Sequence, residues 1–376
     1  MAVPVLHVCD KFGVAGSSIH GVSRLFSWWF PRYDRRFEVS LVGLKDPEPA
    51  SQRLAEAGIP VHHLGRGKFD PRLLGDLLRI ARERRARILH VHGYAAANFG
   101  RLAARRLGAK LVLHEHFADP RMPAYQALAD RLLAPLTDRA IAVSASTREF
   151  LVQQRFVPAE RVRLIWNGAP LDEFAPVDRE RALALRHDLG IPESAPLVGI
   201  VGRVNAQKGH RFLIEAAPRV LERVPEGRFL VVGDGDLLEA SRRQAADLGV
   251  GDRFVFAGHR VDVPAVLGAL DVFCIASTYE GTPLALFEAM AAGKAIVSTA
   301  VDGCREVLDD GVTARLVPPE DPVALADALV ALLADRTLRK ALADNARKAS
   351  LRYDIGACVR QMEALYDELL GGSRAA

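Results

Sequence analysis

Residues 272–293 read VFCIASTYEGTPLALFEAMAAG, and this stretch predicts one complete strand–loop–helix unit. The apolar run Val272–Ile275 has the length and composition of a buried strand. A loop with a glycine follows, and Pro283 suits the first position of a helix, where its missing N–H is harmless. Two carboxylates, Glu280 and Glu288, stand eight positions apart in the loop and the helix. The unit is typical of a parallel α/β sheet.

Short apolar runs of the same kind alternate with helical patterns along the whole chain. Near-continuous Val, Ile and Leu in such runs favour parallel sheets that are covered on both faces. Two successive sets of runs predict two doubly wound domains. The turn sequence Asn167-Gly168, followed by Ala169-Pro170, marks the expected boundary, with domains over 1–168 and 169–354. The predicted strands are 3–9, 38–43, 88–92, 110–114, 140–143 and 162–165, then 197–201, 229–232, 254–257, 272–275, 295–298 and 314–317.

Composition excludes several classes of protein. Among 376 residues, 49% are hydrophobic and 26% are charged, which excludes a disordered chain. The net charge of +4 is a mild basic bias, and no basic segment alternates with aromatics, so we expect no nucleic acid partner. The four cysteines form no CxxC pair, which disfavours structural zinc and a redox dithiol and fits a reducing compartment. We read no signal peptide and no membrane span, and expect a cytoplasmic protein.

Two basic side chains follow the predicted strand 197–201. Arg203 and Lys208 flank a loop that ends at Gly209, at the end of a parallel strand where open α/β sheets bind ligands. An arginine fork and a lysine ammonium group can together hold a diphosphate. The alternative is a pair of solvated surface cations.

The loop over 276–282 and the helix after it form a second candidate site. The free N–H groups of Leu284 and Ala285 would favour an anion at the helix N-terminus. Glu280 and Glu288 could both accept hydrogen bonds from the vicinal hydroxyls of a sugar or ribose. The alternative is that Glu280 caps the helix and Glu288 is a surface acid, although the neighbours of Glu288 are apolar.

Two further motifs have simpler interpretations. The stretch Gly233-Asp234-Gly235-Asp236 resembles a metal-binding DxD or a lone GxG, but we favour a glycine turn with Asp236 as the N-cap of a helix over 237–248. The pair His114 and His116 could belong to a metal cluster. No third ligand is evident in the sequence, so we expect no metal here.

The ordered set of segments 201–209, 233–235, 256–259 and 277–293 resembles the retaining glycosyltransferases of family GT4, which have the GT-B fold. Glu280 and Glu288 match the E-x7-E motif of that family. The resemblance covers about residues 4–370 and implies two Rossmann-like domains that face a cleft. It also implies that a C-terminal helix over about 355–370 packs back on the first domain.

The resemblance implies a role for each matching residue. Arg203 and Lys208 would neutralise the donor diphosphate, Glu288 would hold the ribose, and Glu280 would hold sugar hydroxyls. The nucleotide base would lie near Gly258, His259 and Arg260. The backbone of the loop and helix start would contact the sugar or phosphate through Gly281, Thr282, Pro283, Leu284 and Ala285. Such enzymes use no catalytic metal and no other cofactor, and the leaving phosphate helps to deprotonate the acceptor hydroxyl.

In the first half, a glycine-rich loop and a histidine match the family pattern. Gly16 and Gly21 are the candidates for backbone contact with the donor phosphates, and His20 replaces a glycine that the family has there. His116 is placed beside the sugar, as a catalytic residue with Arg203, Lys208 and Glu280. For His90 and His92 we expect core or supporting roles.

The aromatic stretch 26–30, FSWWF, is expected to pack on the sheet. The alternative is that part of it meets lipid, aided by the basic run 79–87, so that the enzyme is peripheral at the inner face of the membrane and glycosylates a membrane-linked acceptor.

The predicted reaction transfers a hexosyl-type sugar from a UDP- or GDP-sugar to a hydroxyl of a glycan, a lipid-linked acceptor or a small molecule, with retention. The alternatives are a nucleotide-sugar 2-epimerase of the same fold and a non-catalytic partner subunit.

Overall fold

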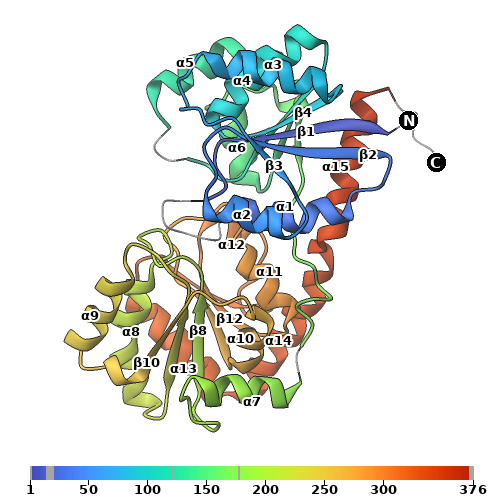
Figure 1. Cartoon of the computed structure of the whole chain (residues 1–376). Helices are drawn as coiled ribbons and strands as arrows, with labels where there is room; N and C mark the ends of the chain where they lie inside the picture. The colour runs from blue at the N-terminus through green and yellow to red at the C-terminus, as the bar shows by residue number, and fades with distance from the viewer. Residues whose placement is uncertain (1, 14–20, 120–121, 177, 372–376) are drawn as a thin grey trace. The chain divides into compact units, whose positions relative to one another are not determined.

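The computed structural model of the chain describes residues 2–13, 21–119, 122–176 and 178–371. It divides into two compact units, Met1–Asn167 with Ile355–Ala376, and Gly168–Asp354. Each unit is built around one parallel sheet with helices on both faces, as the alternation of apolar runs and helical patterns predicts (Figure 1). The predicted α/β architecture of two doubly wound sheets is therefore confirmed.

The N-terminal unit has a sheet of seven parallel strands in the order β3-β2-β1-β4-β5-β6-β7. Helices α3, α4 and α5 lie on one face, and α1, α2 and α15 lie on the other (Figure 1). The strands are β1 Val3–Cys9, β2 Phe37–Gly43, β3 Val61–His63, β4 Ile88–His92, β5 Lys110–Glu115, β6 Arg139–Ala142 and β7 Val162–Leu164. The helices are α1 Gly21–Trp29, α2 Pro49–Glu56, α3 Arg72–Glu83, α4 Tyr94–Leu107, α5 Ala124–Leu133, α6 Ala145–Gln153 and α15 Ile355–Leu369.

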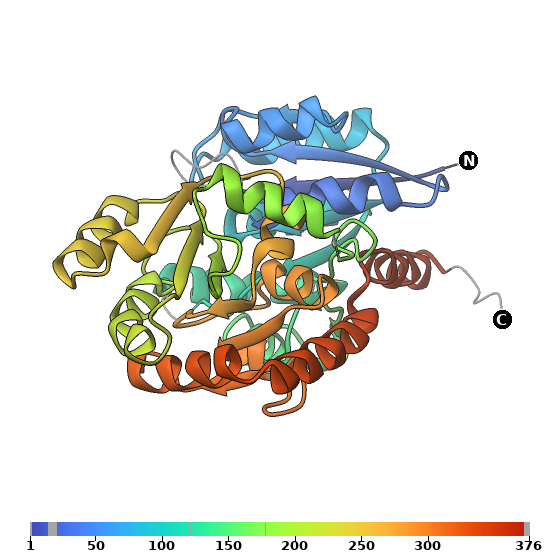
Figure 2. The same ribbon diagram turned by 90° about the horizontal axis from the view of Figure 1, so that it is seen from below.

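The C-terminal unit has a sheet of six parallel strands in the order β10-β9-β8-β11-β12-β13. Helices α8 and α13 pack side by side on one face (Figures 1 and 2). The strands are β8 Leu197–Val201, β9 Arg228–Val232, β10 Phe254–Gly258, β11 Val272–Ile275, β12 Ala295–Thr299 and β13 Arg315–Val317. The helices are α7 Arg179–Asp188, α8 His210–Arg223, α9 Leu238–Asp247, α10 Val263–Ala269, α11 Leu284–Ala291, α12 Asp302–Arg305, α13 Pro322–Ala334 and α14 Arg336–Ser350.

Three details differ from the prediction. Strand β3 was missed, because three residues at the sheet edge are too short for a pattern of alternation. Pro283 is the N-cap of α11 and not its first residue, with extended dihedral angles of −70° and 123°. Helix α9 begins after Leu237, and no side chain caps it, so Asp236 is not the N-cap.

The aromatic stretch after the first loop is buried in the N-terminal unit. Phe26 and Trp29 are fully buried and Trp28 is 6% exposed, so the interpretation as sheet packing is confirmed. These buried rings cannot meet lipid. Nor does any helix in the described parts of the chain have both the length and the apolar composition to cross a bilayer.

Candidate functional site

The loops after β8, β9 and β10 are joined through their backbones at the carboxyl edge of the C-terminal sheet. The N–H of Gly202 donates to Val232 O at 2.9 Å, and the N–H of Gly233 donates to Gly258 O at 2.8 Å. A Cβ on Gly233 would lie 1.9 Å from the carbonyl oxygen of Gly202, so only glycine allows this approach. Close backbone packing explains the glycine-rich stretch 233–235, and the carboxylate of Asp234 accepts from the next N–H at 2.7 Å.

An ion pair joins the β8 loop to the β11 loop. Lys208 Nζ lies 2.5 Å from Glu280 Oε1, and Ser277 Oγ donates to the same oxygen at 2.7 Å. The Glu280 side chain is 6% exposed and that of Lys208 is 24% exposed, so solvent screens the pair less than a surface pair. The structure thus brings together two residues that the sequence separates by 72 positions.

Backbone contacts fix the distance between these two loops. The N–H of Thr278 donates to Gln207 O at 2.8 Å. Gly209 has a φ of +64°, and a Cβ there would lie 1.9 Å from Ala276 O. The side chain of Asn205 accepts from the N–H of Lys208 at 3.1 Å, which holds the lysine at the end of the loop. The ammonium group is therefore positioned by the backbone on both sides.

Helix α11 presents its N-terminus to the same loop. Pro283 is its N-cap and Thr282 is buried. Leu284 and Ala285 are half-buried in the first turn, and their N–H groups have no intrahelical acceptor. Glu288 is fully buried within the helix, so it is not a surface acid. On the far side, a Cβ on Gly303 would lie 1.7 Å from Gly281 O, so the start of α12 supports the loop. This end of the sheet therefore gathers the Lys208 ammonium group, the Glu280 carboxylate and the N–H groups of the first turn of α11.

The two predicted arginines, Arg203 and Arg260, differ in whether a carboxylate pairs with them. Within the described residues, Arg203 makes no ion pair with a carboxylate, and it is half-buried at the start of the β8 loop. Arg260 holds Asp262 with both sides of its guanidinium group, at 2.8 and 2.7 Å, and this contact raises the pKa of Arg260. His259 is exposed, and Gly258 has a φ of +63°. Any ligand contact near Gly258 would therefore use the backbone more readily than the Arg260 fork.

In the N-terminal unit, Gly21 is the exposed first residue of α1, with open space around its α-carbon. Gly16 and His20 lie outside the described residues. His116 follows β5, is half-buried, and its Nε2 lies 3.0 Å from His92 Nδ1.

His116 belongs to a cluster of imidazoles that the sequence did not reveal. Ring nitrogens of two sets of three histidines lie within 4.8 Å of one another, namely His7, His90 and His92, and His92, His114 and His116. The expectation that His114 and His116 lack a third histidine nearby is wrong, because β4 lies beside β5 and supplies it. Alternation along β4 and β5 hinted at the shared face, but the pairing with β1 is visible only in the fold.

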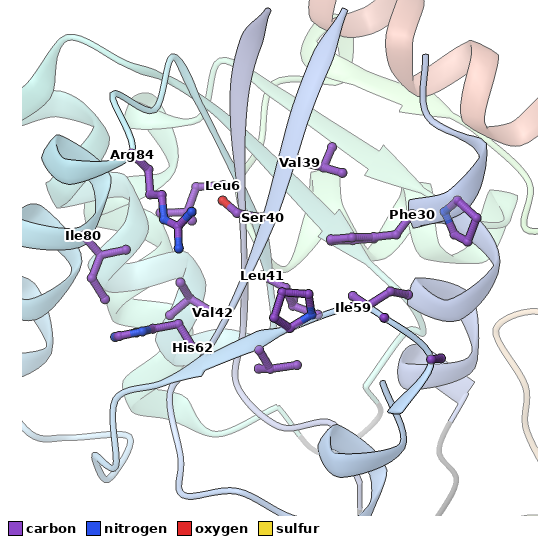
Figure 3. A pocket seen from close by; sticks show the side chains of 15 residues that line it. Leu6, Phe30, Val39, Ser40, Leu41, Val42, Ile59, His62, Ile80 and Arg84 are labelled. Carbon is purple, nitrogen blue, oxygen red and sulfur yellow. The ribbon is translucent and has the colours of Figure 1, made fainter. Parts of the chain in front are cut away.

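A pocket lies elsewhere, at the edge of the N-terminal sheet (Figure 3). It has a volume of about 540 Å³ and is lined mainly by apolar side chains, with Phe30, Leu41 and Ile59 among them. It forms because β3 pairs only with the last three residues of β2 and leaves the first half of β2 uncovered. None of the predicted site residues lines it.

A smaller hollow of about 280 Å³ lies beside the β8 loop, against α9. Asn205, His210 and Gln244 line it. Burial, and then the charge of Lys208, lower the pKa of His210 to about 3, so its ring is neutral.

Comparisons with known proteins agree with this geometry. The family model described as glycosyl transferases group 1 matches residues 195–335, and that described as glycosyltransferase family 4 matches residues 29–173. The chain is 31% identical over 293 residues to the phosphatidyl-myo-inositol mannosyltransferase of Mycobacterium tuberculosis, covering 76% of this chain and 74% of that protein. It is 27% identical over 279 residues to the UDP-Gal:alpha-D-GlcNAc-diphosphoundecaprenol alpha-1,3-galactosyltransferase of Escherichia coli, covering 72% of each.

Among solved structures, the fold is similar to that of the Anabaena protein HepE in complex with UDP. The TM-score is 0.85, with 23% identity over 97% of this chain and 100% of that one. The fold and the coverage of the mannosyltransferase together show that this chain belongs to the family 4 glycosyltransferases of the GT-B fold.

Proposed function

We propose that the protein is a retaining, metal-independent glycosyltransferase that moves a hexosyl-type sugar from a UDP- or GDP-sugar to a hydroxyl of a glycan, lipid-linked or small-molecule acceptor. The observation that carries the proposal is the ion pair of Lys208 with Glu280 beside the N-terminus of α11, with Glu288 buried in the same helix. A cation, helix N–H groups and carboxylates within one loop cluster suit a diphosphate that carries sugars on both sides.

The cationic residues would stabilise the leaving group. In the proposed site, Arg203 and Lys208 bind the diphosphate, and their effect grows in the transition state as negative charge develops on the leaving oxygen. Glu280 already holds the Lys208 side chain in one conformation, so little further ordering of the ammonium group is needed when the donor binds. The pair therefore pre-organises the cation at the point where charge develops.

The carboxylates would recognise hydroxyl groups. Ser277 and Lys208 both donate to Oε1 of Glu280, and Gln207 Nε2 lies 3.5 Å from Oε2. We propose that Glu280 accepts from the hydroxyls of the transferred sugar, while Glu288 accepts from the ribose. His116 and the backbone of Gly16 and Gly21 are proposed to contribute from the N-terminal unit, and the backbone at 258–260 to contact the base.

The proposal includes retention of configuration without a metal. The leaving phosphate oxygen would take the proton of the acceptor hydroxyl as the new glycosidic bond forms on the same face of the sugar. The names of the two enzymes above support a sugar donor linked to a nucleotide and an acceptor of lipid or inositol type. The bound UDP of HepE supports a uridine nucleotide as the first choice of donor.

The experiment is a screen of UDP-, GDP- and ADP-sugars, in which release of the nucleoside diphosphate and the anomeric form of the sugar are followed with and without chelator. Slow hydrolysis of one donor with an α-configured product supports the proposal. Conversion of the donor to its 2-epimer would instead establish an epimerase, and absence of donor binding by calorimetry would indicate a non-catalytic partner subunit.

A further inference from the structure

The histidine cluster of the N-terminal unit lies on one face of three neighbouring strands. His7 is on β1, His90 and His92 are on β4, and His114 and His116 come from β5 and the residue after it. In the strand register, His7 is opposite His90, and His92 is opposite His114. Four of these rings are at most 2% exposed, so their polar nitrogens must bond to one another or to other protein groups.

The rings form edge-to-edge hydrogen bonds in which each contact joins an Nδ1 to an Nε2. His7 Nδ1 lies 3.1 Å from His92 Nε2, and His92 Nδ1 lies 3.0 Å from His116 Nε2. In a second row, His90 Nε2 lies 3.1 Å from His114 Nδ1. The bonded rings are within 20° of parallel, so each in-plane lone pair faces the N–H of its neighbour.

Two tyrosine hydroxyls connect the row His116, His92, His7 to the row His114, His90, by bridging His7 and His90. Tyr366 of α15 lies 2.5 Å from His90 Nδ1 and 3.1 Å from the hydroxyl of Tyr33. The Tyr33 hydroxyl in turn lies 3.4 Å from His7 Nε2. The result is one continuous series of hydrogen bonds, here called the imidazole relay, which runs in the order His116, His92, His7, Tyr33, Tyr366, His90, His114.

The ring geometry suits shared protons better than a metal ion. His90 and His92 stack at 4.7 Å and 20°, and His114 and His116 stack at 4.5 Å and 15°. A metal binds imidazole in the plane of the ring at about 2.0–2.1 Å. A point in the plane of one ring lies well out of the plane of the ring stacked on it. Three such rings therefore cannot aim at one ion without leaving their stacks.

When every contact of the series is a hydrogen bond and the Tyr33 hydroxyl does not donate to Met362 Sδ, which lies 3.7 Å away, the relay can be polarised in only two ways. A neutral imidazole has one N–H donor and one acceptor nitrogen, so fixing one proton fixes the next along the series. In the first polarity every histidine carries its proton on Nδ1, and His114 ends the relay with a lone pair on Nε2. In the second, every proton is on Nε2, and His114 ends with a buried N–H. Each polarity leaves one terminal N–H, on Nδ1 of His116 in the first and on Nε2 of His114 in the second, and both atoms are buried. The His114 residue is 1% exposed, whereas His116 is half-buried after the end of the strand, so the terminal N–H is better accommodated at His116, which favours the first polarity.

We propose that the imidazole relay sets the tautomer of His116. Tyr33, Tyr366 and the buried histidines act as positioning residues that make Nε2 of His116 an acceptor from His92 and place the His116 proton on Nδ1. The Nδ1–H of His116 is thereby held as a donor in one orientation at the carboxyl end of the sheet. The consequence for sugar transfer rests on the proposed function, whereas the tautomer itself does not.

The charge state agrees with this arrangement. Burial lowers the pKa of His7 to about 3 and lowers the pKa of His90, His92 and His114 well below the usual range, the last three also through neighbouring imidazoles. These four rings are therefore neutral at physiological pH.

The test reads the tautomers directly by NMR of the protein labelled with ¹⁵N in the histidine rings, without substrate at pH 7.5. In the unsubstituted protein we expect a protonated Nδ1 and an unprotonated Nε2 for all members of the relay. Tyr33→Phe removes the donor to His7, so His7, His92 and His116 should become mixtures of both tautomers. Phe30→Leu is the control, because Phe30 packs on His7 at 5.3 Å through its ring alone and its loss should leave the tautomers unchanged.

In the same variants, Tyr33→Phe should lower kcat by roughly two- to tenfold, the range of one neutral hydrogen bond, with the donor KM unchanged. A protonated Nε2 on His92 or His116 in the unsubstituted protein, or unchanged tautomers in Tyr33→Phe, would overturn the relay. So would stoichiometric binding of added Zn²⁺ that shifts these ring signals. Shifted tautomers with unchanged kcat would overturn the catalytic consequence. Failure of the unsubstituted protein to turn over any donor would bear on the proposed function alone, because the tautomers are read without substrate.

Discussion

The buried histidines predict that acid destabilises the two units to different extents. In the N-terminal unit, the pKa of His7, His90, His92 and His114 lies well below the unfolded value near 6.5, chiefly because burial disfavours the charged ring. A folded pKa below the unfolded one stabilises the fold above pH 6.5, and this stability is lost as the pH falls toward the folded pKa. The unfolded chain then takes up protons that the folded unit excludes.

The magnitude follows from proton linkage. Between pH 7.5 and 5.5, each histidine that stays neutral when folded lowers the free energy of unfolding by about 1.4 kcal/mol. The four histidines together lower it by about 5.5 kcal/mol, which is comparable to the whole stability of many domains. In the C-terminal unit, the lowered pKa of His210 gives about 1.4 kcal/mol. The N-terminal unit should therefore unfold first on acidification.

Intrinsic fluorescence can separate the units, because Trp28, Trp29 and Trp166 all belong to the N-terminal unit. Urea unfolding is followed by fluorescence at pH 7.5 and 5.5, for the unsubstituted protein and for His7→Asn. The carboxylates contribute equally to both proteins, so the difference between their losses of unfolding free energy gives the contribution of His7 alone. The variant should lose about 1.4 kcal/mol less over this range.

His62→Asn is the matched control, because His62 is exposed and belongs to the same unit, and this variant should lose as much stability over the pH range as the unsubstituted protein. Equal losses in His7→Asn and the unsubstituted protein would refute the account of His7 as a buried neutral ring. His114→Gln repeats the comparison at the other end of the relay.

Three further predictions concern the C-terminal unit. Glu280→Gln should lower kcat/KM for the donor about 10- to 100-fold in steady-state assays with little change in Tm, because the carboxylate that is paired with Lys208 and is proposed to bind sugar hydroxyls is lost. Normal kinetics would remove Glu280 from the site. Gly303→Ala should destabilise the unit by about 1–3 kcal/mol in urea unfolding and weaken donor binding, because its Cβ would press on Gly281 O. Gly75→Ala, in α3 of the N-terminal unit and with open space around it, is the control and should change neither the stability of the C-terminal unit nor donor binding. Turnover should be unchanged after chelation, and activity restored only by Mg²⁺ would return Asp234 to consideration as a ligand.

Much of the fold could be predicted because buried parallel strands are short apolar runs that need no long-range information. Strands β1, β4, β8 and β11 have the predicted bounds. The short edge strand β3 could not be found, because half of its pairing surface is absent and its sequence, Val-His-His, is not apolar. The predicted starts of α11 and α9 each differ from the observed start by one residue, at Pro283 and Asp236. Local cap preferences do not fix where the first turn of a helix begins.

The candidate site was predictable in its parts and not in its contacts. Residue types and spacing indicated Lys208, Glu280 and Glu288, but the direct pairing of Lys208 with Glu280 depends on β8 lying beside β11 in the sheet. The imidazole relay was missed for the same reason. His7 and Tyr366 are remote in sequence from His116, and only the strand order and the return of α15 to the N-terminal sheet bring them together.

The most direct test of the central claim is the rate of nucleoside diphosphate release from the preferred donor by Lys208→Ala. Lys340→Ala is the matched control, because Lys340 is a surface lysine with a side chain that is 75% exposed and paired with Asp344. If Lys208 stabilises the leaving diphosphate, kcat should fall about 100- to 1000-fold in Lys208→Ala, with Tm and far-UV circular dichroism unchanged and Lys340→Ala fully active. A folded Lys208→Ala protein with a rate within a few-fold of the unsubstituted enzyme would contradict the assignment of this loop as the diphosphate site.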